Sequence, residues 1–157
     1  MSDFDLTRYL PYLINRTGVR IATAFGEVLR EHGITLQMWR VLAALDHADG
    51  QRISDLAALT SIDVSTLSRL IDAMQEKDLV DRRRSNGADA RVVTVHATDA
   101  GHALTPKIIP RARHYEEVAL QGFTAEEQET LKAMLARVYG NIDALEEEAA
   151  GGKIKAA

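Results

Sequence analysis

The chain has 157 residues, 19 basic and 23 acidic side chains, a formal net charge of -4 and no cysteine. A chain of this length normally forms one domain, or one domain with an appended dimerisation element. It buries roughly two-thirds of its unfolded surface, so it needs no disulfide to be stable. The lack of cysteine excludes disulfides, thiolate metal sites and a cysteine nucleophile, and it fits a reducing compartment. The start of the chain does not resemble a leader, and no apolar run reaches the roughly 18 residues of a membrane span. We therefore expect a cytoplasmic protein with no membrane partner.

The acidic excess lies mainly in one part of the chain. Residues 97–157 carry a net charge of -3, whereas residues 61–96 are neutral and contain a cluster of arginines. The cluster consists of Arg82, Arg83, Arg84 and Arg91. The average charge therefore excludes a broadly basic surface, but it does not exclude a nucleic-acid partner.

Helical periodicity dominates the start of the chain. Apolar residues recur in steps of three and four over 11–31, which predicts a long first helix. Gly33 is placed to end this helix, and Thr35 is a suitable N-cap for a second one. The second helix is expected to end near the turn at Gly50.

Two shorter helices are predicted next. One covers about residues 54–59, and the other begins after Asp63, a good N-cap. The apolar stripe of this fourth helix consists of Leu67, Leu70, Ile71 and Met74. Its opposite face starts with short polar side chains and an arginine: Ser65, Thr66, Ser68 and Arg69.

After Val80 the pattern changes to that of strands. Residues 81–84 and 91–96 flank an Asn-Gly turn and predict a two-stranded hairpin. Side chains alternate along a strand, so Arg82 and Arg84 should lie on one side of the hairpin and Arg83 on the other.

Two further helices complete the chain. Thr98 caps the fifth helix, which we expect to be broken or bent by Pro106 and Pro110. Thr124 and Glu127 form a capping box at the start of the sixth. The apolar residues of the sixth helix have a near-heptad spacing, typical of a seam between two helices. They are Leu131, Leu135, Val138, Ile142 and Leu145.

These elements, in this order, predict a winged helix-turn-helix: a mainly α fold with a small β-hairpin wing. The recognition helix of such a fold presents its N-terminal residues to base edges in the major groove. Ser65 and Thr66 can donate to or accept from bases, and Arg69 can reach a guanine edge or a phosphate. The guanidinium groups of the hairpin suit phosphate contact or a narrow minor groove.

Five segments form a motif set by their order and spacing. They are Gly33–Leu42, Asp63–Asp72, Lys77–Val80, Asp89–Arg91 and Ala97–Gly101. Together they resemble the MarR family of bacterial transcription regulators over about residues 10–148. The resemblance implies an obligate homodimer on a pseudo-palindromic operator. In many members a small, often aromatic ligand releases the DNA.

The resemblance also implies how the chain is divided. A single domain over 1–157 would contain a DNA-binding lobe, 34–97, and a helical dimerisation region, 5–32 and 98–148. We expect residues 149–157 to form a flexible tail.

The expected DNA contacts combine the recognition helix with the wing. In the family's wing motif the aspartate braces the wing and the arginine reaches DNA, and these positions fall on Asp89 and Arg91. A solvated charged face is the ordinary explanation for such side chains, but the order of the elements favours DNA contact. The full set is Ser65, Thr66, Ser68, Arg69, Arg82, Arg84, Asp89 and Arg91. Of the wing residues, we expect Arg84 and Arg91 to matter most.

A ligand site is expected on the helices that would line the family's cleft. The candidates are Tyr9, Tyr12, Arg16, Trp39, Arg40 and His114. Arg16 or Arg40 could pair with a ligand carboxylate. The segment 9–16 resembles the start of members that control aromatic-acid or hydroxycinnamate catabolism, some of which answer to acyl-CoA thioesters. Aromatic acids and their thioesters are therefore the expected ligand class.

Other functions find less support in the sequence. The five histidines lack the spacing of a metal site, and the chain has no Gly-rich phosphate loop and no nucleophile elbow, so we expect no metal, no cofactor and no enzyme. We predict a sequence-specific, DNA-binding transcriptional regulator, a repressor released by a small ligand. The alternative is a protein-interaction module that uses the seam of the last helix and binds DNA weakly and without specificity.

Overall fold

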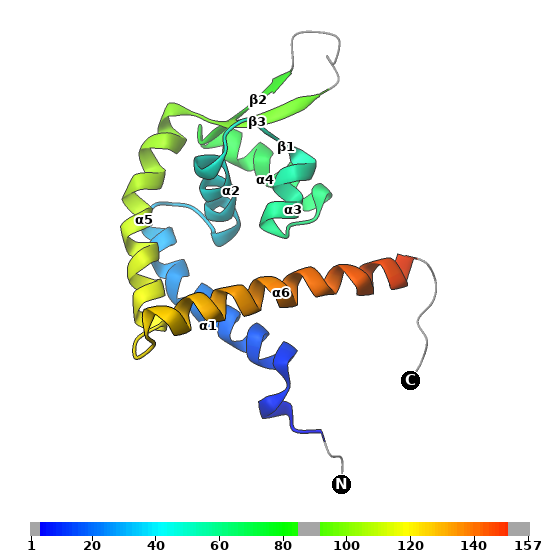
Figure 1. The fold of residues 1–157 in the computed structure, drawn as a ribbon. Coiled ribbons are helices and arrows are strands. Elements are labelled where there is room, and N and C mark those ends of the chain that lie inside the picture. The colour runs from blue at the N-terminus through cyan, green and yellow to red at the C-terminus, as the bar shows by residue number, and fades with distance from the viewer. Residues whose placement is uncertain (1–3, 85–91, 151–157) are drawn as a thin grey trace. The chain divides into compact units, whose positions relative to one another are not determined.

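The structure is a computed structural model that describes residues 4–84 and 92–150. In this part of the chain, α-helices accompany a small antiparallel sheet, so the predicted mainly α fold class is confirmed. The chain divides into two compact units, Met1–Glu116 and Glu117–Ala157. In chain order the elements are η1 (Leu6–Arg8), α1 (Leu10–Glu31), α2 (Leu36–His47), β1 (Gln51–Arg52), α3 (Ile53–Thr60), α4 (Val64–Glu76), β2 (Val80–Arg84), β3 (Val93–Ala97), α5 (Asp99–Ala119) and α6 (Ala125–Ala150) (Figure 1).

Gly33 ends α1 as the sequence predicts. It has a φ of +68°, a left-handed conformation that glycine adopts at no steric cost. The N–H of Gly33 donates to Arg30 O at 3.0 Å, and the N–H of Ile34 donates to Leu29 O at 3.2 Å. This pair of bonds is a Schellman motif, which satisfies the last carbonyls of the helix.

The predicted N-caps are also confirmed. Thr35 Oγ1 accepts the N–H of Met38 at 3.3 Å at the start of α2. Thr98 Oγ1 accepts the N–H of Gly101 at 3.1 Å and so caps α5. Each cap satisfies an amide that has no partner inside its helix.

The sheet has one strand more than the predicted hairpin. Its order is β1-β3-β2, so β3 lies between the other two and pairs antiparallel with both. Val95 of β3 is opposite Gln51 on one side and Arg82 on the other. The predicted hairpin is confirmed as β2 and β3. The strand β1 was not predicted, because it is only two residues long and is defined by its pairing with β3, not by a pattern of its own.

The core of the first unit lies between the sheet and the helices α2, α3 and α4. Figure 1 shows these helices gathered on one side of the strands, and residue contacts join each of them to the sheet or to one another. The predicted stripe of α4 is confirmed, since Leu67, Ile71 and Met74 are fully buried and Leu70 is partly buried against the same core. The helix α4 is therefore fixed by its apolar side, and its polar side is free to serve a function.

The helix α5 is continuous, so of the two expectations for its prolines, a break or a bend, the break was wrong. Pro106 and Pro110 lie four residues apart on the exposed side of the helix, whereas Thr105 and Ile108 are buried. A proline removes one amide donor, and a carbonyl that loses its partner on an exposed side can bond to water instead. Burial of Ile108 then keeps the helix intact through both prolines.

The second unit consists mainly of α6. The N–H of Thr124 donates to Glu127 Oε2 at 2.8 Å, and the N–H of Glu127 donates to Thr124 Oγ1 at 3.2 Å, which confirms the capping box. Several apolar side chains of the predicted seam are exposed in the single chain, among them Leu135, Ile142 and Leu145. Among the described residues, no helix is both long and apolar enough to cross a membrane.

Candidate DNA interface and ligand pocket

Asp63 is the N-cap of α4, the helix that the sequence predicts to be the recognition helix, and its carboxylate accepts several hydrogen bonds. Its Oδ1 accepts the hydroxyl of Ser65 at 2.7 Å and the N–H of Thr66 at 2.9 Å. The side-chain hydrogen bond from Thr66, then that from Ser65, then the Thr66 N–H hold the pKa of Asp63 far below the usual range of a carboxyl. Asp63 is therefore an ionised acceptor at neutral pH, and it fixes the orientation of the residues that follow it.

The outward face of α4 carries the predicted contacts. Ser65 and Arg69 are exposed and lie one turn apart, while Thr66 and Ser68 are half-buried. Within the described residues, Arg69 forms no hydrogen bond or ion pair, so its guanidinium donors are available to a ligand. The structure therefore brings together the four residues that the sequence assigns to this helix.

Arg82 has a different environment from the one the sequence predicts. Its side chain is only 26% exposed and forms an ion pair with Asp72 of α4. The guanidinium also donates to Ser68 O at 2.9 Å, to Ser68 Oγ at 3.3 Å and to Gln75 Oε1 at 3.0 Å. These bonds connect β2 to three successive turns of α4, so Arg82 acts as a brace between the wing and the recognition helix.

The other predicted wing residues divide into two groups. Arg84 is exposed at the end of β2, opposite Val93 of β3. Asp89 and Arg91 lie outside the described residues.

A histidine–aspartate pair, which the sequence analysis did not identify, fixes the base of the wing. Asp49 Oδ2 lies 2.8 Å from Nδ1 of His96, and Asp49 Oδ1 accepts the N–H of Ala97 at 2.9 Å. Partial burial raises the pKa of Asp49, but the hydrogen bonds from Ala97 and His96 outweigh it and leave the pKa below its usual range. Gly50 follows with a φ of +74°, and a Cβ at this position would lie 2.8 Å from the His96 ring. Only the Asp-Gly turn signal was readable in the sequence, and it gave no indication of this partner.

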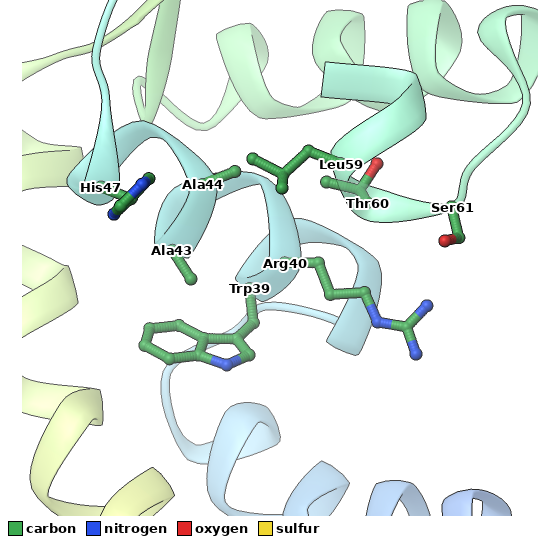
Figure 2. Close-up of a pocket in the computed structure, with 8 residues that line it drawn as sticks. All are labelled: Trp39, Arg40, Ala43, Ala44, His47, Leu59, Thr60 and Ser61. Carbon is green, nitrogen blue, oxygen red and sulfur yellow. The ribbon is translucent and has the colours of Figure 1, made fainter. Parts of the chain in front are cut away.

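A cavity of about 500 Å³ lies between α2 and the end of α3. Figure 2 shows Trp39 and Arg40 extending from α2 and Leu59 pointing toward α2 from the end of α3. Trp39 is half-buried, with its ring 6.1 Å from that of Phe25 in an edge-on arrangement. The lining residues are Trp39, Arg40, Ala43, Ala44, His47, Leu59, Thr60 and Ser61.

The structure places only part of the predicted ligand set at this cavity. Trp39 and Arg40 line it, whereas the remaining four residues lie elsewhere on or next to α1 and α5. The ring centroids of Tyr9 and Phe4 are 5.0 Å apart, and those of His114 and Tyr115 are 6.3 Å apart. The four residues outside the lining are Tyr9, Tyr12, Arg16 and His114. Residues 4–84 and 92–150 hold no cluster of three or more histidines or carboxylates able to bind a metal ion.

Known proteins resemble this chain in both sequence and fold. A family model described as the MarR family matches residues 32–91. The chain is 31% identical to an uncharacterised HTH-type transcriptional regulator of Bacillus subtilis, YdgJ, over 73% of this chain and 69% of that protein. A MarR-family transcriptional regulator from Silicibacter pomeroyi has the same fold, with a TM-score of 0.80 and 31% identity over 90% of this chain and 95% of that one. The chain belongs to the MarR family.

Membership of the MarR family makes the protein a transcriptional regulator with a winged helix-turn-helix. The family and the fold are those of transcriptional regulators rather than of enzymes. A second regulator of Bacillus subtilis, YybA, is 31% identical over 88 residues, which cover 58% of its length. The helix α4 and the strands β2 and β3 lie within or next to the residues that the family model matches.

Two further structures share the fold at lower identity. One describes regulation of DNA binding of Bordetella bronchiseptica BpsR by 6-hydroxynicotinic acid, with a TM-score of 0.78, 22% identity and coverage of 88% of this chain and 98% of that one. The other is the transcriptional repressor CouR bound to a 23-mer DNA duplex, with a TM-score of 0.76, 23% identity and the same coverage of both chains. At this identity the likeness extends to the MarR fold alone.

Proposed function

We propose that this MarR-family regulator is a homodimeric repressor that binds a pseudo-palindromic operator and releases it when a small aromatic acid binds. The observation that carries the proposal is the two-sided character of α4. Leu67, Ile71 and Met74 of its apolar stripe are fully buried, while Ser65 and Arg69 are exposed on the opposite side. Arg82 of β2 donates hydrogen bonds to the helix. CouR, which shares the fold, is a repressor bound to a DNA duplex.

In this proposal the two recognition helices of a dimer enter successive major grooves about 34 Å apart. Ser65, Thr66, Ser68 and Arg69 then face bases and phosphates, and Arg84 contacts the flanking backbone. In the family's wing motif, the aspartate at position 89 braces the wing and the arginine at position 91 reaches DNA, so Asp89 and Arg91 are proposed in these roles. Arg82 supports the helix instead of touching DNA, because the donors of both its Nη1 and its Nη2 are used inside the protein.

The dimer would be formed by residues 5–32 and 98–148, with 34–97 as the DNA-binding lobe. Large apolar side chains are exposed on both α1 and α6 in the single chain, which supports this assignment. Exposed apolar faces of this kind normally mark protein interfaces.

The DNA part of the proposal is tested by titrating the DNA upstream of the protein's own gene against an unrelated duplex of equal length. We expect preferential binding of the upstream duplex, with a steep dependence on salt. Arg69→Ala should weaken binding and reduce the salt slope by about one unit. The matched control Arg137→Ala removes an exposed arginine of α6 and should change neither. Equally weak binding of both duplexes would contradict the proposal and favour a protein-interaction module.

The ligand part of the proposal rests on the cavity beside Trp39. Its volume of about 500 Å³ lies within the usual range for small-ligand sites. Trp39 offers an aromatic surface, and the guanidinium of Arg40 can pair with a carboxylate, so the lining fits an aromatic acid. BpsR, which shares the fold, has its DNA binding regulated by 6-hydroxynicotinic acid.

Trp39 is the single tryptophan of the chain, so its fluorescence reports directly on this cavity. We would titrate a panel of aromatic acids and their acyl-CoA thioesters into the protein and into its DNA complex. The expected result is a fluorescence change that coincides with DNA release and that weakens in Arg40→Ala but not in Arg16→Ala, because Arg16 does not line the cavity. If the response is lost in Arg16→Ala and kept in Arg40→Ala, the ligand binds outside this cavity.

A further inference from the structure

The hydroxyl of Ser65 is the donor in its hydrogen bond with Asp63. Ser65 Oγ lies 2.7 Å from Asp63 Oδ1, and the carboxylate of Asp63 also accepts the N–H of Thr66. An ionised carboxylate can only accept hydrogen bonds. The proton of the Ser65 hydroxyl therefore points to Asp63, and Ser65 can offer DNA only its lone pairs.

An acceptor in the major groove distinguishes between bases. Adenine N6 and cytosine N4 carry exocyclic amines that donate, whereas guanine O6 and N7 and thymine O4 only accept. Ser65 is exposed at the start of the recognition helix, where residues face base edges. The negative charge of Asp63 beside it adds repulsion against an acceptor edge.

We propose that Ser65 determines specificity by accepting a hydrogen bond from the exocyclic amine of an adenine or a cytosine in each half-site, and that Asp63 fixes this choice by holding the hydroxyl proton. The inference rests on the proposed DNA binding and names which bases α4 reads. It replaces the more general expectation that this hydroxyl can both donate and accept.

Arg69 supplies the opposite chemistry on the same face of the helix. A guanidinium only donates, and Arg69 has no partner among the described residues, so it suits guanine O6 and N7. Four residues of helix advance about 6 Å, which corresponds to one or two base-pair rises of about 3.4 Å. Each half-site should therefore contain an amine-bearing base within about two positions of a guanine.

Selection from a library of random duplexes, followed by sequencing, tests the inference with the full-length protein. We compare the wild type with Ser65→Ala, Asp63→Gly and Ser54→Ala. Ser54→Ala is the matched control, because it removes another exposed serine hydroxyl bonded to a neighbouring aspartate. Glycine is chosen at position 63 because it is tolerated at an N-cap while it frees the Ser65 proton.

The wild type and Ser54→Ala should select adenine or cytosine at one position in each half-site. Ser65→Ala should lose the preference there alone, and Asp63→Gly should relax it to admit guanine or thymine. In the selected duplex, replacing an adenine at this position by purine, which lacks the N6 amine, should weaken wild-type binding about two- to tenfold and leave Ser65→Ala unchanged. For a selected cytosine, the analogue without the N4 amine serves the same purpose.

Two results would overturn the inference while leaving the proposed function intact. One is a Ser65-dependent position that selects guanine or thymine in the wild type. The other is a selected sequence that Ser65→Ala leaves unchanged. Failure to select any sequence would instead overturn the proposed function, and the inference with it.

Discussion

The helices α4 and α6 are both amphipathic, but only α4 buries its apolar side within one chain. Leu67 and Ile71 of α4 are 0% exposed, whereas Leu135 and Ile142 of α6 are each 44% exposed. The apolar face of α4 is therefore buried within the first unit, whereas that of α6 is exposed. In the proposed dimer, folding of the DNA-binding lobe and assembly of the regulator thus depend on different side chains.

The helix α1 buries its apolar side chains near its end and exposes them near its start. Phe25, Val28 and Leu29 near its end are buried in the core of the first unit. Apolar residues nearer its start, such as Leu13 and Ile14, are 40% exposed. The apolar stripe predicted for this helix is thus buried within its own chain only in the last third of the helix. The remainder is exposed and available to a partner.

The largest predicted effect breaks the seam on α6. Leu135→Glu places a charge on the exposed apolar side and should convert the dimer to a monomer. A monomer holds one half-site, so operator affinity should fall by roughly 10²–10⁴-fold. Sedimentation analysis and DNA titration measure the two effects.

The same substitution should leave the unfolding of the monomer nearly unchanged, because surface substitutions usually cost within about 0.5 kcal/mol. Glu129→Gln, at an exposed polar position of α6, is the control and should preserve the dimer. If Leu135→Glu remains dimeric and binds DNA normally, the interface does not include this side of α6.

A pair of glycine substitutions sharpens the comparison between the two units. Gly101 is buried in α5, and a Cβ there would overlap Leu79 O of the backbone, so Gly101→Ala should destabilise the protein by about 1–3 kcal/mol. Gly140 of α6 has no neighbour within 4 Å of a Cβ, so Gly140→Ala should stabilise the protein by about 0.5–1 kcal/mol through helix propensity.

Urea unfolding at fixed protein concentration measures both changes. Gly140 lies on the side of α6 opposite the seam by helical spacing, so its substitution should not alter the oligomeric state. A stabilising effect of Gly101→Ala would contradict the close approach of α5 to the backbone of Leu79.

The sequence predicted the features that are decided locally. The caps Thr35, Asp63 and Thr124 each bond to an amide three residues later, so their partners are visible in the same short segment. The continuity of α5 could not be read in this way, because it depends on the burial of Ile108 against the rest of the chain. The strand β1 was missed for the same reason, since its pairing with β3 defines it.

The candidate site residues also divide into those that local spacing predicts and those that depend on packing between distant segments. The outward face of α4 follows from helical spacing, and the structure places Ser65 and Arg69 on it. Strand alternation places Arg82 on the same side as Arg84, so it was expected to contact DNA, but alternation does not reveal the partner of a side chain. Its bonds to Ser68 and Asp72 depend on how β2 packs against α4.

Arg82 provides the third prediction, with a smaller effect. Arg82→Ala removes the brace between β2 and α4, so operator affinity should fall about fivefold through poorer positioning. The salt slope should stay the same, because no phosphate contact is lost. In Arg84→Ala, by contrast, the slope should decrease by about one unit, since Arg84 is exposed. A reduced slope in Arg82→Ala would show that its guanidinium reaches the DNA after all.

The smallest predicted effect concerns the charge of the cap on α4. Hydrogen bonds in the folded protein lower the pKa of Asp63, so the stabilisation by its carboxylate is present above the ordinary carboxyl pKa of about 4 and is lost as the pH falls below it. Asp63→Ala should therefore differ most from the wild type in urea midpoint between pH 5 and pH 8, as rough bounds, and the difference should shrink at lower pH. Thr35→Ala removes a neutral cap of α2, so its cost of about 1 kcal/mol should not depend on pH in the same way. If the difference in urea midpoint between the wild type and Asp63→Ala stays constant down to about pH 3, the hydrogen bonds of Asp63 do not favour its ionised form. The argument that the Ser65 hydroxyl always donates to Asp63, and can only accept from DNA, would then lose its physical basis.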